Sequence, residues 1–225
     1  MTKNMSRITK LTILLSALMF ASNSRASNDI KTDSLKLVQI VNEFYDWYIS
    51  AIKEENNTDY MPRFVESENG MTTLDFSVYF ENLKTHRFSD SLIIKEKESY
   101  SKCIENLRMV KFSDFGKTVF TTLDEDEEAC CDFGNRFRWT GGMEPVDGMR
   151  IQDIRFISTD TALVSIEYSW LGFDEDLDAE YTYYGGGNKL ILSKQDNDWY
   201  IDKVDSFGEP CREWVKIEFE IDFDK

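Results

Sequence analysis

The stretch ALVSIEYSWL, residues 162–171, decides the fold class of this chain, because its side chains fall into two alternating series. The more apolar series is Ala162, Val164, Ile166, Tyr168 and Trp170. An apolar side chain at every second position is typical of a β-strand that buries one face, since successive side chains point to opposite sides of a strand. The segment therefore predicts a long strand.

Segments on both sides of this stretch have the same period of two. Residues 151–157 predict a preceding strand, and residues 189–194 and 199–204 predict a hairpin across the turn-rich residues 195–198. Near the C-terminus, apolar and charged residues alternate over 215–223, which predicts an extra strand. The second half of the chain is therefore expected to form an antiparallel meander.

The first half has a helical period instead. Apolar residues recur at spacings of four and three at Leu37, Val41, Phe44, Tyr48 and Ala51. Asp33 or Ser34 is expected to cap this helix, which should end near Glu55. Further helices are expected over residues 73–86 and 90–108, with a strand that begins at Ile93-Ile94 as the alternative for the second segment. Helices followed by an antiparallel sheet predict the α+β class, with the helices on one face of the sheet.

The first 26 residues have the order of a secretory signal peptide. Basic residues and no acid precede an apolar run at 11–21, and small residues follow at Ser22, Ser24 and Ala26. Cleavage is expected after Ala26, with Ala21 as the alternative. The apolar run is about 11 residues, against the roughly 20 that a membrane span needs. The protein is therefore expected to be exported to the periplasm or the extracellular space, without a membrane span after cleavage.

Between the expected helices and the expected strands, residues from about 114 to 148 follow neither the helical period nor the period of two. The acidic run at 124–128 is followed by a region rich in glycine, and an irregular segment of this length is expected to be cross-linked. No repeat or linker divides the chain. Residues 27–225 are therefore expected to form a single domain with an irregular insertion.

Four cysteines, Cys103, Cys130, Cys131 and Cys211, lie after the leader. In an oxidising compartment four cysteines allow two disulfides in three pairings. A bond between the neighbours Cys130 and Cys131 would be strained, which favours Cys103 with one of them and Cys211 with the other. A zinc site of four thiolates is the alternative, but the spacing of the cysteines does not match such sites. No metal site is therefore predicted.

The charge balance excludes one class of function. The chain has 26 basic and 42 acidic residues, a net charge of −16, and removal of a leader with four basic residues and no acid leaves −20. An acidic surface repels phosphate, so nucleic-acid binding is not expected. The single histidine excludes chemistry that needs two imidazoles. No nucleotide, hydrolase or metalloprotease motif is present, and no cofactor is expected.

The segment Phe44-Tyr45-Asp46-Trp47-Tyr48 resembles the F-Y-x-W-Y signature of a family of exported bacterial proteins of unknown function. The strand patterns at 162–166, 189–192 and 199–204 also look like this family, and the likeness covers roughly 37–205 with a poor match in the middle third. The family is assigned to the nuclear-transport-factor-2-like, or cystatin-like, cone fold. The resemblance implies a helix laid across a curved sheet around a pocket, but no activity. The insertion with its cysteines and the extra C-terminal strand depart from that pattern.

Aromatic residues are the main candidates for ligand contacts, because flat rings stack on sugars or small apolar molecules. The candidate ligand-binding residues are Trp139, Tyr183, Tyr184, Tyr168 and Tyr48. Trp139 and the two adjacent tyrosines lie in glycine-rich segments that are expected to be loops. The alternative is that such rings fill the core, which is favoured for Trp47, Trp170 and Trp199.

Acidic residues are the main candidates for contacts with a protein partner. The candidates are Asp124, Glu125, Asp126 and Glu127 in one expected loop, and Asp174 and Asp176 in a second. The spacing of Asp174, Asp176 and Asp178 also opens a calcium loop, but Ala179 and Gly185 stand where that loop needs Gly and Glu. A solvated bend is therefore the favoured interpretation of the second segment.

Three functions remain open. The first hypothesis is an exported, non-enzymatic protein that binds a small molecule or glycan in a pocket or on an acidic loop face. The alternative is an acidic immunity or inhibitor protein that binds a basic toxin or enzyme in the envelope. The weakest is a pocket isomerase or hydrolase that uses Asp46 or His86. The sequence favours a solvated Asp46 and a surface His86 at a helix end.

Overall fold

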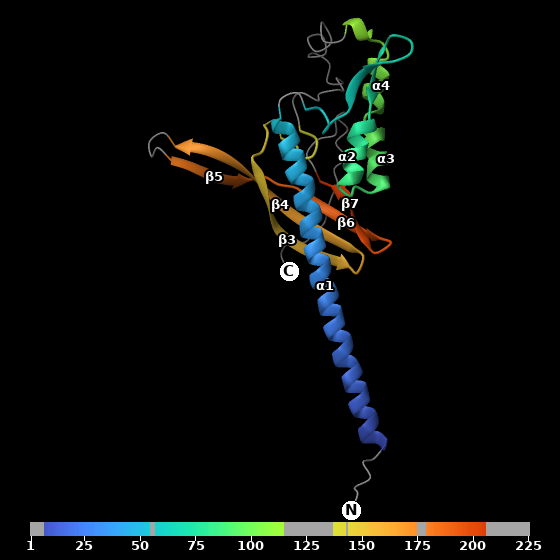
Figure 1. Ribbon diagram of the computed structural model, residues 1–225, viewed down its shortest axis with the longest axis vertical. Helices are drawn as coiled ribbons and strands as arrows, with labels where there is room; N and C mark the ends of the chain where they lie inside the picture. The colour runs from blue at the N-terminus through green and yellow to red at the C-terminus, as the bar shows by residue number, and fades with distance from the viewer. Residues whose placement is uncertain (1–6, 55–56, 115–136, 143, 175–178, 206–225) are drawn as a thin grey trace, which may run out of the picture.

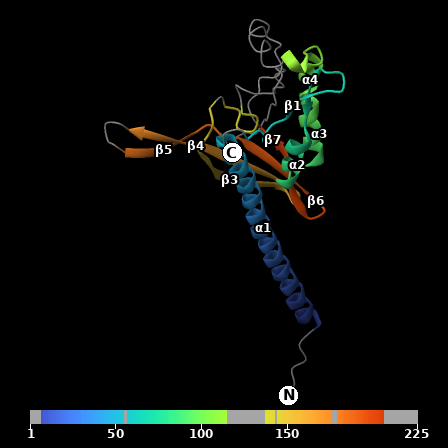
Figure 2. The ribbon, with the colours of Figure 1, turned by 45° about the horizontal axis from the view of Figure 1, so that its top comes forward.

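The computed structural model describes residues 7–54, 57–114, 137–142, 144–174 and 179–205, with side chains from residue 30 onward except at 173, 174 and 179. Four helices precede an antiparallel five-stranded sheet, so the α+β class is confirmed. Helix α1 crosses one face of the sheet, and α2 and α3 lie beside it near strand β7 (Figures 1 and 2).

Helix α1 spans Arg7–Lys53. Its buried stripe includes Leu37, Val41 and Phe44, as the period predicts. The predicted start of this helix is wrong, because Asp33 and Ser34 lie inside α1 rather than at its cap. The Asp33 carboxylate instead accepts a hydrogen bond from Lys194 Nζ (2.9 Å), which ties α1 to the sheet. The N-terminal half of α1 extends beyond the sheet (Figure 1).

The helix predicted over 73–86 begins later. Strands β1 (Arg63–Glu66) and β2 (Thr72–Asp75) form an antiparallel hairpin, and α2 spans Ser77–Thr85. The β-branched pair Thr72 and Thr73 favours the strand. The Asp75 carboxylate accepts a hydrogen bond from the Ser77 amide (2.9 Å), which stabilises the change from strand to helix.

The helix predicted over 90–108 is present in two parts. Helix α3 spans Asp90–Ser99 and α4 spans Ser101–Leu107, with Tyr100 between them, and a short 3-10 turn follows at Phe112–Asp114. The Ser89 hydroxyl caps α3 by accepting a hydrogen bond from the Leu92 amide (3.1 Å).

The sheet contains β3 (Gly148–Ser158), β4 (Thr161–Asp174), β5 (Ala179–Gly185), β6 (Lys189–Gln195) and β7 (Asp198–Val204). Its order is β3-β4-β6-β7, and β5 also pairs with β4. Strand β4 therefore has two partners along one edge: β6 pairs with its first residues and β5 with its last. Beyond the end of β3, β4 and β5 continue as a two-stranded ribbon that projects from the body (Figure 1).

The predicted strands over 151–157 and 162–171 and the predicted hairpin are confirmed by β3, β4, β6 and β7. Asp196 and Asn197 have φ of +50° and +68°, as a tight hairpin turn requires. Strand β5 was not predicted. It occupies part of the segment that the sequence indicates as loop.

Several predictions lie outside the described residues: the strand at 215–223, most of the insertion, and the partners proposed for Cys103. Cys103 itself is buried on α4, and its disulfide stays a prediction. Within the described residues, no helix combines enough length with enough apolar character to cross a membrane.

Candidate functional site

Residues 137–142 form a compact loop that carries Trp139 into the interior. The Phe137 amide donates to the Gly142 carbonyl (2.8 Å), and the Gly141 amide donates to the Phe137 carbonyl (2.7 Å). Gly141 has a φ of +69°, a left-handed conformation that glycine adopts without strain. Only 1% of Trp139 is exposed. Its ring packs edge-on against Phe88 (5.0 Å between centroids) and Phe44 of α1 (6.2 Å), so the loop fills space beside α1.

Four side chains hold the main chain of Trp139. Its amide donates to the Tyr48 hydroxyl (3.2 Å). Its carbonyl accepts hydrogen bonds from Asn188 Nδ2 (2.7 Å), the Tyr168 hydroxyl (3.1 Å) and the Tyr45 hydroxyl (3.2 Å). These residues come from α1, β4 and the connection between β5 and β6. We call Tyr45, Tyr48, Trp139, Tyr168 and Asn188 the interior cluster.

Burial keeps the hydroxyl groups of the interior cluster protonated. Burial raises the pKa of Tyr45 to about 12 and raises the pKa values of Tyr48 and Tyr168 well above the usual range. A protonated hydroxyl can donate to a carbonyl, as Tyr45 and Tyr168 do. The cluster is therefore a set of neutral donors and acceptors that stabilises the loop.

A buried ion pair fixes the same loop to α3. Arg138 Nη2 lies 2.7 Å from Glu96 Oε2, and the Tyr79 hydroxyl donates to Glu96 Oε1 (2.8 Å). Burial by itself lowers the pKa of Arg138, but the adjacent Glu96 carboxylate raises it above the usual range. Burial and the charge of Glu96 raise the pKa of Tyr79. Because both oxygens of Glu96 already accept hydrogen bonds, this carboxylate serves as an anchor rather than a base.

The structure brings together three of the five candidate ligand-binding residues, Trp139, Tyr48 and Tyr168. All three are buried and are hydrogen-bonded within the interior cluster. A ligand would reach them only after the loop at 137–142 had moved. Buried polar groups usually have partners. Trp139 Nε1, Thr140 Oγ1 and Asn188 Oδ1 have none among the described residues.

The other two candidates, Tyr183 and Tyr184, lie on β5 and point to opposite faces of the ribbon, because they are consecutive in a strand. Tyr183 pairs with Trp170, and their rings stack at 5.4 Å with 14° between the planes. Tyr181 continues this row, 6.0 Å from the Tyr183 ring. A Cβ on Gly172 would lie 2.4 Å from the Tyr181 ring, so any other residue at 172 would displace that ring from its present position.

We call Trp170, Tyr183 and Tyr181 the aromatic row. About half of Tyr181 and Tyr183 is exposed, 49% and 46%, whereas Trp170 is partly buried. The sequence places Trp170 with the core and did not identify Tyr181 as a candidate. The signal in the sequence is the alternation of β4, which extends past Trp170 towards the acidic and glycine-rich residues that are typical of a loop.

The opposite face of the ribbon has a charged contact. The Arg150 guanidinium lies 3.9 Å from the centre of the Tyr184 ring, and Arg150 also pairs with Glu167 at 2.5 Å. Tyr184 is 45% exposed. The ribbon therefore already holds one guanidinium against a tyrosine ring.

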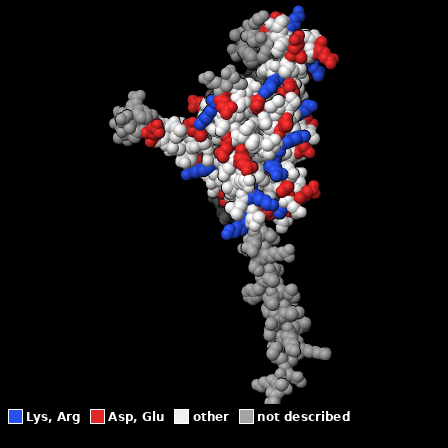
Figure 3. Space-filling model, in the orientation of Figure 1, with Lys and Arg blue, Asp and Glu red and all other residues white. Residues whose placement is uncertain are grey.

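The structure does not describe the side chains of the candidate acidic residues. Asp124, Glu125, Asp126, Glu127 and Asp176 lie outside the described residues, and Asp174 ends β4 with its side chain undescribed. Glu180 is exposed near the start of β5. In Figure 3 red atoms of acidic residues lie next to the grey atoms at the end of the ribbon.

The two candidate catalytic residues are far from catalytic geometry in different ways. Asp46 is exposed, as expected. His86 is half-buried and stacks on Trp47 (4.7 Å, 22°) rather than lying on the surface, and burial lowers its pKa although Glu43 raises it. No group of three His, Cys, Asp or Glu in the described part of the chain is arranged to hold a metal ion.

No protein-family model, curated protein or solved structure matches this chain. The resemblance of residues 44–48 to an exported family, and the cone arrangement that it implies, stay predictions. The candidate site is therefore argued from geometry alone.

Proposed function

We propose that this protein is an exported, non-catalytic binding protein that engages a basic protein partner through its β4–β5 ribbon. The observation that carries the proposal is the aromatic row. Trp170, Tyr183 and Tyr181 lie along one face of a projecting ribbon and are partly exposed, whereas the interior cluster is buried. Exposed aromatic residues dominate the binding energy of many protein interfaces.

The ring geometry favours a protein over a glycan. Sugars stack on open ring faces, and the stacking of Trp170 on Tyr183 covers one face of each of these two rings. Besides the remaining ring faces, the row offers ring edges and tyrosine hydroxyls, which suit the mixed contacts of a protein surface. A small molecule or glycan stays the alternative ligand.

The charge of the molecule favours a basic partner. The chain has a net charge of −16, and Glu180 and Asp174 lie at the end of the ribbon. Acidic surfaces speed the association of cationic proteins by electrostatic steering. The Arg150 guanidinium on the Tyr184 ring gives an example, within this chain, of the contact that arginines of a partner would make.

The outer edge of β5 offers a second mode of contact. Among the described strands β5 pairs only with β4, so its other edge carries main-chain groups without a strand partner. Such an edge accepts an added strand from another protein. Side-chain stacking and main-chain pairing on one ribbon fit an inhibitor or immunity protein.

Export, the cone fold and the disulfides belong to the same proposal. The leader-like residues 1–26 support export, and an oxidising compartment would allow Cys103 to form a bond with Cys130 or Cys131. The mass of the exported protein after alkylation without reductant should not change. Uptake of four alkyl groups would contradict the disulfides.

The binding proposal is tested with a fluorescent deca-arginine peptide as the probe. We expect saturable binding that weakens with added salt, and about tenfold weaker binding for the double variant Tyr181→Ala/Tyr183→Ala. Glu180→Gln should also weaken binding.

The matched control for charge is Glu98→Gln, which removes an exposed acid from α3. It should bind the peptide like the wild type. Equal losses for Glu180→Gln and Glu98→Gln would show binding to the general acidic surface and would contradict a site on the ribbon.

A further inference from the structure

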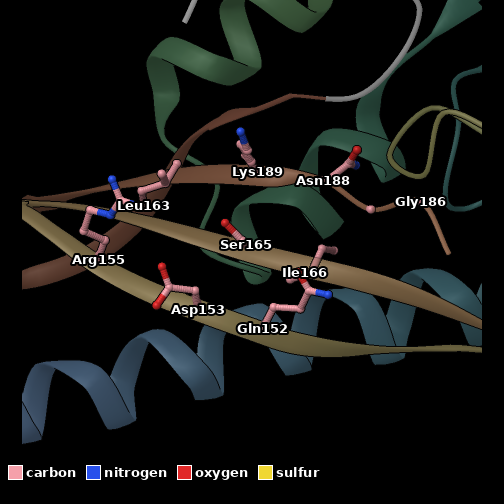
Figure 4. Close-up of a pocket in the computed structure, with 10 residues that line it drawn as sticks. Gln152, Asp153, Arg155, Leu163, Ser165, Ile166, Gly186, Asn188 and Lys189 are labelled. Atoms are coloured by element: carbon pink, nitrogen blue, oxygen red, sulfur yellow. The ribbon is translucent and has the colours of Figure 1, made fainter. Parts of the chain in front are cut away.

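A groove of about 500 Å³ opens on the sheet where β5 ends and β6 begins. It is lined by side chains of β3 and β4 and by Gly186, Gly187, Asn188 and Lys189 (Figure 4). Ser165 of β4 lines the groove. Tyr168 of β4 faces α1, where it contacts Tyr45. Because Ser165 is three positions before Tyr168, its side chain points to the opposite face of the sheet, away from α1. The groove shares Asn188 with the interior cluster but opens on the other face of the sheet, and no residue of the aromatic row lines it.

The glycines of the connection are required by its path. Gly186 has a φ of +57°, and Gly187 has a φ of +151° with its ideal Cβ only 2.0 Å from the Ile166 carbonyl oxygen. The Ile166 amide donates to the Asn188 carbonyl (2.9 Å), which fixes the connection against β4. Any other residue at 187 would collide with the main chain of β4.

Three successive amides in this connection have no acceptor among the described residues. The main-chain N–H groups of Gly186, Gly187 and Asn188 donate to no residue in the described part of the chain. Successive amides around a left-handed glycine form a concave surface that binds anions. Gly186 is exposed and Gly187 is half-buried, and neither carries a side chain that could cover its amide.

The side chains around the groove have a local excess of positive charge in an acidic protein. Arg155 and Lys189 line it, and Arg155 makes no ion pair with a described residue. Ser165 of β4 pairs in register with Asp153 of β3 and with Lys189 of β6. The Asp153 carboxylate therefore belongs to the same row of residues across the sheet as Lys189 (Figure 4). Among the described residues that line the groove, two are basic and one is acidic.

We propose that this groove binds a small molecule through a phosphate or carboxylate group. The planar guanidinium of Arg155 can donate two parallel hydrogen bonds to such an oxyanion. The Lys189 ammonium, the Ser165 hydroxyl and the three amides supply further donors. The volume falls in the range of small-molecule sites rather than of macromolecular surfaces. The proposal does not depend on the ribbon or on its partner.

The test uses the full chain labelled with ¹⁵N and titrated with sodium phosphate, sodium acetate or sodium chloride at matched ionic strength. The amide signals of Gly186, Gly187 and Asn188 should shift and saturate with phosphate or acetate but not with chloride. A response to phosphate alone assigns a phosphate ligand, and a response to acetate alone assigns a carboxylate. No saturable shift with either anion overturns the proposal.

Matched variants locate the site. Arg155→Gln/Lys189→Gln should weaken binding by about tenfold or more, and Asp153→Asn should strengthen it because it removes the opposing charge. Arg108→Gln removes an exposed cation from the end of α4 and should bind like the wild type. Equal weakening by Arg108→Gln and by the double variant would reduce the effect to net charge and contradict the site.

Discussion

The interior cluster and the aromatic row share one strand but differ in what covers them. Tyr168 of β4 is 2% exposed and donates to the Trp139 carbonyl beneath α1. Trp170 lies two residues further along the same face of β4. Its ring stacks on Tyr183 of the ribbon and stays partly exposed. The rings of Tyr168 and Trp170 are still in contact, 6.5 Å between centroids.

The difference shows that the alternation in β4 specifies which of its faces is apolar. It does not specify how far along the strand that face is buried by other parts of the chain. Trp139 supplies the cover over Tyr168, from a loop 29 residues earlier in the chain. The ribbon past β3 has no such cover among the described residues. We therefore assign stability to the interior cluster and binding to the aromatic row.

The largest expected effect separates these two roles. Trp139→Ala should lower the free energy of unfolding by about 3–5 kcal/mol, because it leaves a cavity beside Phe88. Urea denaturation measures this loss. Tyr183→Ala, the matched change in the aromatic row, should cost less than about 1 kcal/mol. Similar losses for the two variants would contradict the division.

The next effect concerns the anchor of the loop. Glu96→Gln should cost about 3 kcal/mol, because the Arg138 guanidinium would stay buried without a counter-charge. The double variant Glu96→Gln/Arg138→Met should recover part of that loss, since no charge is then buried. A double variant that is less stable than Glu96→Gln in urea would show that Arg138 acts in some other way.

A smaller effect is expected within the interior cluster. Tyr45→Phe removes one of three donors to the Trp139 carbonyl and should cost about 1 kcal/mol. Tyr184→Phe on the ribbon should leave the urea midpoint unchanged. If both substitutions are neutral, the hydrogen bond of Tyr45 does not contribute to holding the loop.

The smallest effect is a dependence on pH. Burial lowers the pKa of His86 in the folded protein below the ordinary 6.5, so the unfolded chain binds this proton more tightly. The contribution of neutral His86 is therefore present above pH 6.5 and is lost as the pH falls through that value. His86→Gln should show a shallower loss of stability between about pH 7.5 and about pH 5.5 than the wild type. Parallel curves for the two proteins would contradict this assignment.

Much of the fold follows from the sequence because periodicity is a local property. The strands at 151–157 and 162–171 and the helical stripe of α1 are found where apolar spacing predicts them. The hairpin of β1 and β2 was not predicted, since its strands are short and partly polar. Strand β5 was not predicted because its glycine and acidic neighbours are typical of loops.

The sites depend on contacts that periodicity does not encode. Glu96 and Arg138 are 42 residues apart, and nothing in either segment indicates the ion pair. Aromatic content identified Trp139, Tyr168 and Tyr183 together, but burial separates the first two from the third. Which tyrosine of the adjacent pair 183 and 184 faces the aromatic row follows only once both are placed on a strand.

The most direct test of the central claim is nitration of tyrosines with tetranitromethane, mapped by mass spectrometry with and without deca-arginine. The account predicts that Tyr181 and Tyr183 are nitrated in the free protein and protected by the peptide, whereas Tyr45, Tyr48 and Tyr168 stay unmodified in both samples. Nitration of the interior tyrosines with no protection on the ribbon would contradict it.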